Sequence, residues 1–184
     1  CLAGKFYTCP DFYQFEVETF LKKEWHCVGR VDEVASPGDF FTTFLFEEPL
    51  LICRGDDGEI RTLSNLCRHR GMLLAEGRGT TRRFVCSYHA WSYARDGQLS
   101  NAPRMQDKGV NAENCSLPSF RTELWNGFIY VNLDDSAAPL SSKLHNLEAL
   151  LGNYETQQMR IVHTQEEIWN TNWKCLVENF MEAY

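Results

Sequence analysis

The sequence of 184 residues has no long apolar run, no excess of positive charge and no export signal. No hydrophobic stretch approaches the roughly 18 to 20 residues that a bilayer-spanning helix needs, so we expect no membrane segment. Lys and Arg number 18 against 25 Asp and Glu, and the net charge of −7 argues against a nucleic-acid-binding surface. No positively charged and then apolar start resembles a signal peptide.

An initiator methionine is missing as well, because the chain begins at Cys1, and it stops at Tyr184 without a turn or a helix breaker. Both ends therefore predict a fragment of a longer protein. Internal repeats and low-complexity tracts are also absent. A content of 43% hydrophobic and 23% charged residues predicts a folded domain rather than a disordered chain.

Eight cysteines are present, and an even number permits a disulfide framework, the usual interpretation for a short secreted chain. The length of the chain and its 13% of aromatic residues weaken this interpretation, because they provide a core without disulfides. Free thiols persist in a reducing cytoplasm, where we expect this protein. Six cysteines lie scattered and are expected to be reduced and mostly buried: Cys1, Cys9, Cys27, Cys53, Cys115 and Cys175.

Cys67 and Cys86 differ from the others, because each has a histidine beside it in a short motif. Cys67 and His69 form C-x-H, sixteen residues follow, and Cys86 and His89 form C-x-x-H. These residue types bind either zinc, with all four around one ion, or a [2Fe–2S] cluster, with two thiolates on one iron and two imidazoles on the other. One ligand of each type in each motif favours the cluster. The remaining histidines have no local partner and are expected to be structural or solvated: His26, His145 and His163.

The pattern of apolar and turn residues predicts one helix followed by a sandwich. Thr8 as a cap and Pro10 in the first turn predict a helix over residues 10–24. From Trp25 to Leu133, short β-like runs separated by turn residues predict a small antiparallel sandwich. The expected strands are residues 25–30, 40–46, 50–54, 59–64, 83–87, 91–93, 98–100, 120–124 and 128–133. Further on we expect a linker at 134–139, a helix at 141–151, an extended segment at 160–170 and an amphipathic helix from Trp173.

Three segments carry a resemblance to a known family: residues 67–71 (CRHRG), 86–93 (CSYHAWSY) and 172–174 (NWK). They resemble the large (α) subunit of ring-hydroxylating-type Rieske non-haem iron oxygenases, and the resemblance covers almost the whole chain. It implies a [2Fe–2S] cluster bound by Cys67, His69, Cys86 and His89. Ala90 departs from the family, which usually has glycine there.

The resemblance also implies the fold and the organisation of the chain. We expect a mainly β fold, a Rieske-type antiparallel β-sandwich with an N-terminal helix, followed by the start of an α+β catalytic domain. The expected parts are an N-terminal helical segment at 1–24, a Rieske [2Fe–2S] domain at 25–135, and a linker with the start of a truncated catalytic domain at 136–184.

The cluster loops differ from those of respiratory and photosynthetic Rieske proteins. Those proteins have a second cysteine in each loop, and the two form a disulfide, whereas this chain has Met72 and Tyr88 at these places. A serine hydroxyl that raises the potential there is also not evident in this sequence. Fewer hydrogen bonds to the sulfurs predict a reduction potential near the bottom of the Rieske range, on the order of −150 mV.

Glu182 matches an acidic residue that, in the family, bridges two metal sites. By resemblance, it hydrogen-bonds an iron-ligating histidine of its own subunit and the equivalent of His89 on the adjacent subunit. Glu178 and Asn179 precede it in the same motif. On periodicity alone, Glu178 and Glu182 would instead form the solvated face of an amphipathic helix. The family's three ligands of the mononuclear Fe(II) are not present, since the first follows directly after Tyr184.

The resemblance implies a terminal oxygenase that hydroxylates a small organic substrate with O₂. It implies a ferredoxin or flavin reductase as electron donor and a homotrimer or an α3β3 assembly, with neither nucleic acid nor membrane as a partner. Glutamate three residues after Asn179 is more similar to carnitine and glycine betaine monooxygenases, which suggests a quaternary amine substrate. The alternatives are an aromatic-ring dioxygenase α subunit, a stand-alone Rieske electron carrier and a zinc-binding interaction module.

Overall fold

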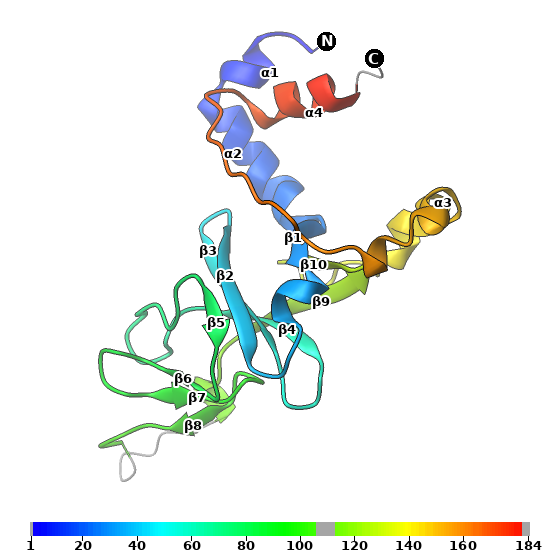
Figure 1. Ribbon diagram of the computed structural model, residues 1–184. Helices are drawn as coiled ribbons and strands as arrows, with labels where there is room; N and C mark the ends of the chain where they lie inside the picture. The colour runs from blue at the N-terminus through cyan, green and yellow to red at the C-terminus, as the bar shows by residue number, and fades with distance from the viewer. Residues whose placement is uncertain (1, 106–112, 182–184) are drawn as a thin grey trace.

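Antiparallel strands form the centre of the structure, a computed structural model that describes residues 2–105 and 113–181 (Figure 1). A seven-stranded sheet has the order β1-β10-β9-β4-β3-β2-β5, and a three-stranded sheet has the order β6-β7-β8. The strands are β1 (His26–Arg30), β2 (Asp39–Leu45), β3 (Glu48–Arg54), β4 (Ile60–Ser64), β5 (Arg78–Thr80), β6 (Phe84–Val85), β7 (Ser92–Tyr93), β8 (Leu99–Asn101), β9 (Ser119–Trp125) and β10 (Phe128–Asn132). The predicted mainly β, antiparallel fold is confirmed.

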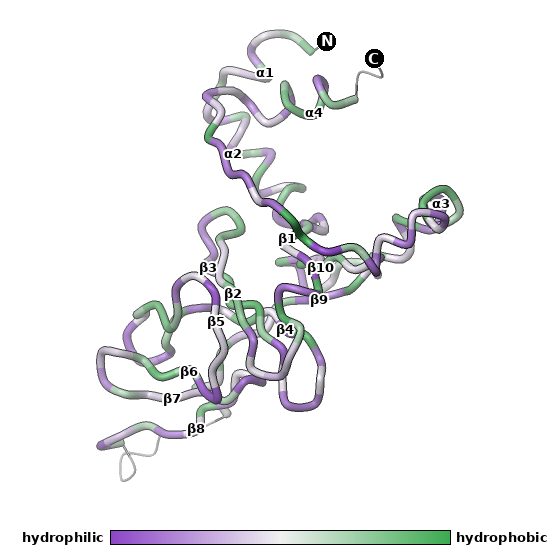
Figure 2. Tube along the Cα trace, in the orientation of Figure 1, coloured by the Kyte–Doolittle hydropathy of each residue, from purple (hydrophilic) through white to green (hydrophobic). Residues whose placement is uncertain are grey.

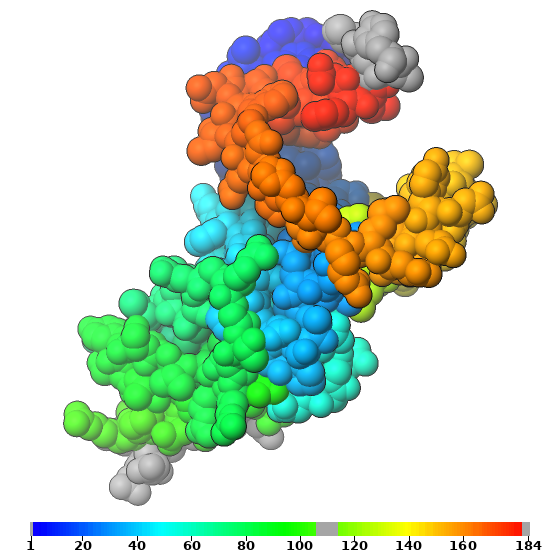
Figure 3. Space-filling model, in the orientation of Figure 1, coloured from blue at the N-terminus to red at the C-terminus, as the bar shows by residue number. Residues whose placement is uncertain are grey.

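Helices lie outside the sheets. They are α1 (Lys5–Thr8), α2 (Pro10–Thr19), α3 (Ser141–Leu151) and α4 (Trp173–Met181), with short 3₁₀ helices at Leu21–Lys23, Val31–Val34, Glu113–Cys115, Gly152–Tyr154 and Thr156–Gln158. Figure 1 shows α4 beside α1, far from the sheet β6-β7-β8 at the other end of the molecule. Residues 159–170, which have no regular structure, lead to α4 along the surface (Figure 3). No helix among the described residues is long and apolar enough to cross a membrane.

Strand β3 separates two hydrophobic cores. Leu51 and Cys53 pack on one face, in the core that also contains Cys67. Leu50 and Ile52 point to the opposite face and pack in the second core. Successive side chains of a strand alternate between faces, so a strand covered on both sides has a continuous apolar sequence. Figure 2 shows this hydrophobic stretch within the sheet, and hydrophobic and hydrophilic residues mixed along α4.

Several predicted boundaries need correction. The helix expected to Glu24 ends at Thr19, because the chain changes to a 3₁₀ helix at Leu21–Lys23. Thr8 does not cap it, since its hydroxyl donates to the carbonyl of Gly4. Strand β5 was not expected at all, because its three residues are all exposed and lack an apolar alternation. The helix predicted at 141–151 is present with these bounds.

The prediction that the scattered cysteines are mostly buried is wrong. Of the five that the structure describes, only Cys53 is buried; Cys27 is exposed, and Cys9, Cys115 and Cys175 are half-buried. All five are free thiols. Cys1 lies outside the described residues. The domain boundaries given above stay a prediction.

Arg30, at the end of β1, joins the sandwich to the segment that follows α3. Its Nη2 donates to the carbonyls of Thr156 and Met159, both at 2.8 Å, and its Nε donates to Asp32 at 3.0 Å. The guanidinium lies 4.6 Å from the centre of the Phe128 ring. Because Arg30 is only 8% exposed, these bonds form with little competition from water.

We predict that Arg30→Lys lowers the free energy of unfolding by about 2 kcal/mol. The planar guanidinium of Arg30 reaches Asp32 and the carbonyls of Thr156 and Met159 at once, and a single ammonium cannot reach all three. Urea titration measures the change. Arg78→Lys is the matched control, since Arg78 is largely exposed in its ion pair with Glu33 and should change stability by less than about 0.5 kcal/mol. Equal effects of the two substitutions would contradict this role of Arg30.

Candidate metal centre

The two Cys-His motifs lie at the tips of two hairpins of the same length. Leu66 pairs with Leu73 across the first tip, and Val85 pairs with Ser92 across the second. Six residues separate the paired positions in each hairpin, with the cysteine as the first of the six. The sequence therefore places Cys67 and Cys86 at equivalent positions.

The main chain closes both tips in the same way. In the first, the amide of Cys67 donates to the carbonyl of Met72 at 2.8 Å, and the amide of Gly71 donates to the carbonyl of Cys67 at 2.9 Å. In the second, Cys86 donates to Trp91 and receives a bond from Ala90 at the same two distances. The fourth residue after each cysteine has a positive φ, +70° at Gly71 and +57° at Ala90.

The cysteines point inward and the histidines lie toward solvent. Cys67 and Cys86 are each 2% exposed and belong to the core between the sheets. His69 is half-buried, His89 is exposed, and their ring centres lie 4.7 Å apart. The structure thus brings the two predicted imidazoles together above a core that holds both predicted thiols.

Two aromatic residues of the second hairpin contact the first one, and no sequence motif indicates either contact. The hydroxyl of Tyr93 lies 3.3 Å from Sγ of Cys67 and accepts a 3.0 Å bond from the amide of Arg68. Burial, and then the contact with Cys67, raises the pKa of Tyr93, so its hydroxyl stays protonated. The hydroxyl can therefore donate a hydrogen bond to the sulfur of Cys67 when that sulfur is a thiolate. The ring of Trp91 stacks on His69 at 4.9 Å.

Positive side chains surround the imidazoles. Partial desolvation of the His89 ring lowers its pKa, and its electrostatic interactions with His69, Arg70 and Arg104 lower it further. A lowered pKa favours the neutral imidazole, which is the form that binds a metal. His69 and His89 also line a cavity of about 510 Å³ together with Trp91 and Arg104.

These donors match the ligand set of a two-iron cluster. Within residues 2–105 and 113–181, no three or more His, Cys, Asp or Glu converge as the ligands of a single metal ion would. A [2Fe–2S] cluster needs only two protein ligands on each of its two irons. Two buried thiols below and two adjacent imidazoles above are a donor set of that kind.

The other predicted site residues have different positions. Glu182 lies outside the described residues. Glu178, on α4, is not simply solvated, since it accepts a 2.5 Å bond from the hydroxyl of Tyr7. His26 is half-buried with Nε2 at 2.6 Å from the carbonyl of Leu21. His145 and His163 are exposed, as expected.

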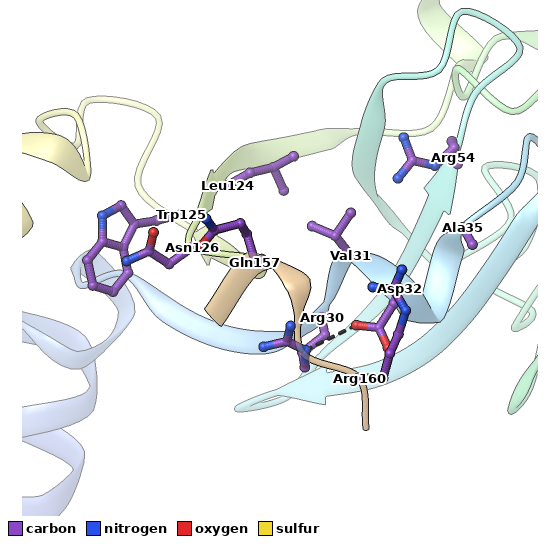
Figure 4. A pocket seen from close by; sticks show the side chains of 11 residues that line it. Arg30, Val31, Asp32, Ala35, Arg54, Leu124, Trp125, Asn126, Gln157 and Arg160 are labelled. Atoms are coloured by element: carbon purple, nitrogen blue, oxygen red, sulfur yellow. Dashed lines mark hydrogen bonds and ion pairs between the residues drawn. The ribbon is translucent and has the colours of Figure 1, made fainter. Parts of the chain in front are cut away.

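A second cavity, of about 500 Å³, lies where residues 157–160 meet the sandwich, and no predicted cluster residue lines it (Figure 4). Arg30, Asp32, Arg54 and Arg160 are among its lining residues. Figure 4 shows the ion pair between Arg30 and Asp32. Because Arg30 is already satisfied by its three acceptors, this cavity belongs to the structural junction described above.

A family model described as the Rieske [2Fe–2S] domain matches residues 24–121. The chain is also 31% identical, over 185 residues, to the carnitine monooxygenase oxygenase subunit of Acinetobacter baumannii, an alignment that covers 97% of this chain and 49% of that protein. The chain therefore spans about half the length of the curated relatives it matches.

Two solved structures have a similar fold. One is a quaternary ammonium Rieske monooxygenase studied for carnitine oxidation by gut microbiota and for inter-subunit electron transfer. It has a TM-score of 0.90 and 30% identity, and the match covers 97% of this chain and 50% of that chain. The other is naphthalene 1,2-dioxygenase with indole bound in its active site, with a TM-score of 0.72 and 32% identity over 77% of this chain and 33% of that chain.

We predict that Ala90→Gly raises the free energy of unfolding by about 1 kcal/mol, because the left-handed backbone at Ala90 is strained for any residue with a Cβ. Urea titration measures it. Ala35→Gly is the matched control: Ala35 is exposed with φ −67° and ψ −34°, so glycine should destabilise there. Destabilisation by both substitutions would contradict the proposed strain.

Proposed function

The chain belongs to the Rieske [2Fe–2S] domain family, and we propose that it is the N-terminal part of the terminal oxygenase subunit of a Rieske non-haem iron oxygenase. The whole protein would use electrons from a cluster, a mononuclear iron and O₂ to hydroxylate a small organic substrate. The similarity to an oxygenase subunit over 97% of this chain supports this function.

In this proposal, Cys67 and Cys86 bind one iron of the cluster as thiolates, and His69 and His89 bind the other as neutral imidazoles. The burial of the two thiols and the 4.7 Å between the imidazole rings support this assignment. A [2Fe–2S] cluster supplies one electron at a time when it is bound. The electron would enter and leave the cluster through the imidazoles of His69 and His89, which reach the surface. The sulfurs of Cys67 and Cys86 are buried and protected from solvent.

The opposite placement of the cluster loops and α4 within one chain is the observation that carries the proposal furthest (Figure 1). Met181, the last described residue of α4, lies away from the cluster loops of the same chain, and Glu182 is the next residue in the sequence. The proposed bridge therefore needs a second subunit, whose cluster loops would reach α4 of the first. A head-to-tail contact of this kind can be repeated in a closed ring, and the ring in this proposal is a homotrimer or an α3β3 assembly.

A quaternary amine is the proposed substrate class. The match to the quaternary ammonium monooxygenase covers 97% of this chain with a TM-score of 0.90, against 77% and 0.72 for naphthalene 1,2-dioxygenase. An aromatic-ring dioxygenase is the second candidate, because sequence identity to the two is nearly the same. A stand-alone electron carrier is less favoured, since α4 extends beyond the sandwich and packs against the N-terminal helices.

The electron donor in this proposal is a ferredoxin or a flavin reductase that reaches the exposed edge near His89. We propose a cytoplasmic location, because the described cysteines, including the exposed Cys27, are free thiols.

We predict that Tyr93→Phe lowers the reduction potential of the cluster by roughly 40 mV, because about 1 kcal/mol of hydrogen bonding to the Cys67 thiolate is lost. Voltammetry of the cluster-loaded protein measures it. Tyr130→Phe is a control, since Tyr130 lies on β10, outside the cluster loops. An unchanged potential in Tyr93→Phe would contradict the role of this hydroxyl.

Glu182→Ala in the full-length protein tests the proposed function. We expect an unchanged cluster spectrum and a loss of hydroxylation of at least roughly 10- to 100-fold, since the link between the two metal sites is removed. Product formed per electron consumed is the measurement. Glu166→Ala, an exposed residue in the segment before α4, is the control and should keep normal activity. Normal turnover in Glu182→Ala would remove the bridging role.

A further inference from the structure

A buried ion pair joins the N-terminal helix α2 to α4. Nζ of Lys174 lies 2.8 Å from Oε1 and 2.6 Å from Oε2 of Glu16. Glu16 is 4% exposed and Lys174 is 8% exposed. The two residues are 158 positions apart in the sequence, so the contact fixes two distant parts of the chain against each other.

Aromatic rings enclose the ammonium of Lys174. Its Nζ lies 5.7 Å from the ring centre of Tyr7, 5.5 Å from that of Phe12 and 5.3 Å from that of Trp173. Such rings attract a cation by their electron-rich faces and exclude water from it. The rings therefore hold the ammonium in place beside Glu16 and shield the ion pair from solvent.

Further polar contacts fix the start of α4 against the N-terminal helices. The side-chain amide of Asn172 donates to the carbonyl of Tyr7 at 3.1 Å, and its oxygen accepts from the amide of Lys174 at 3.1 Å. The second of these bonds caps the helix at its N-terminus. An aromatic contact adds to this junction, with 6.1 Å between the ring centres of Phe20 and Trp173.

A buried ion pair is a poor way to stabilise a fold. Removing both charges from water costs several kcal/mol, and apolar replacements of similar volume are often neutral or stabilising. What the pair adds is a fixed contact between α2 and α4, because Nζ of Lys174 lies within 2.8 Å of both carboxylate oxygens of Glu16. Met181, seven residues after Lys174, lies two helical turns further on the same side, so a rotation at Lys174 is carried to the end of the described helix.

We propose that Glu16 and Lys174 are positioning residues that set the rotation and axial position of α4, the helix ending at Met181 on which the proposed electron transfer between subunits depends. This inference rests on the proposed function, in which Glu182 is the bridge. The N-terminal helices then hold the far end of the electron path, although they lie away from the cluster loops (Figure 1).

The decisive variant in the full-length protein is the double substitution Glu16→Leu/Lys174→Met, which replaces the ion pair by apolar side chains. The matched control is Glu18→Leu/Lys22→Met, which removes an exposed ion pair from α2 and the turn after it. The exchange Glu16→Lys/Lys174→Glu tests whether the pair can act in the reversed order.

Three quantities are measured for each variant. They are the melting temperature, the hydrogen exchange of residues 173–181, and the product formed in a single turnover with O₂ and carnitine, or naphthalene if carnitine is not turned over, after the cluster has been reduced chemically and the reductant removed. For Glu16→Leu/Lys174→Met, we expect a melting temperature within about 3 °C of the unmodified protein and an unchanged cluster spectrum. Exchange in α4 should be at least tenfold faster, and the single-turnover rate should fall at least tenfold. The control Glu18→Leu/Lys22→Met should match the unmodified protein in all three quantities. The variant Glu16→Lys/Lys174→Glu should have more than half of the single-turnover rate of the unmodified protein.

Unchanged exchange and product formation in Glu16→Leu/Lys174→Met would overturn the proposal. So would a fall in melting temperature by more than about 10 °C in that variant, since the pair would then act through stability. A different result tests the proposed function itself: if the unmodified protein forms no product from either carnitine or naphthalene while its cluster is reduced normally, the oxygenase assignment fails. Faster exchange confined to α4 of the double variant would still support the positioning role in that case.

Discussion

Two pairs of main-chain hydrogen bonds, one pair in each hairpin tip, hold the site together. Each cysteine amide donates to the residue five positions on, and each cysteine carbonyl accepts from the residue four positions on. This closure needs a left-handed residue at the fourth position, Gly71 in one tip and Ala90 in the other. Because the tips are closed alike, Cys67 and Cys86 enter the same core and their neighbouring histidines meet at its edge. Tyr93 then fixes one hairpin to the other through Cys67.

The candidate cluster loops and α4 lie far apart in the molecule (Figure 1). In the proposed electron path, the cluster of a second subunit therefore meets the α4 end of the first, and the N-terminal helices act through their contacts with α4. Arg30 links the sandwich to the segment leading to α4, and the pair of Glu16 and Lys174 fixes where that segment ends. Arg30 thus joins the sandwich to the segment after α3, and the pair of Glu16 and Lys174 joins α2 to α4.

Local features were predictable from the sequence, and distant contacts were not. The Cys-His motifs follow from spacing alone, and the helix at 141–151 follows from its periodicity. Strand β5 was missed because its short, exposed residues depend on pairing with β2 and have no apolar pattern. The contact of Tyr93 with Cys67 joins residues 26 positions apart, and no spacing in the sequence predicts this contact. The burial of Lys174 could not be predicted from the sequence either, since only the fold brings Glu16 to it.

Metal and sulfide analysis of the purified protein, together with its absorption spectrum, tests the central claim most directly. That claim is that Cys67, His69, Cys86 and His89 hold a Rieske cluster. We expect two irons and two acid-labile sulfides per chain and a coloured protein, with both colour and iron lost in Cys86→Ala. One zinc per chain without sulfide, and a colourless protein, would contradict the claim.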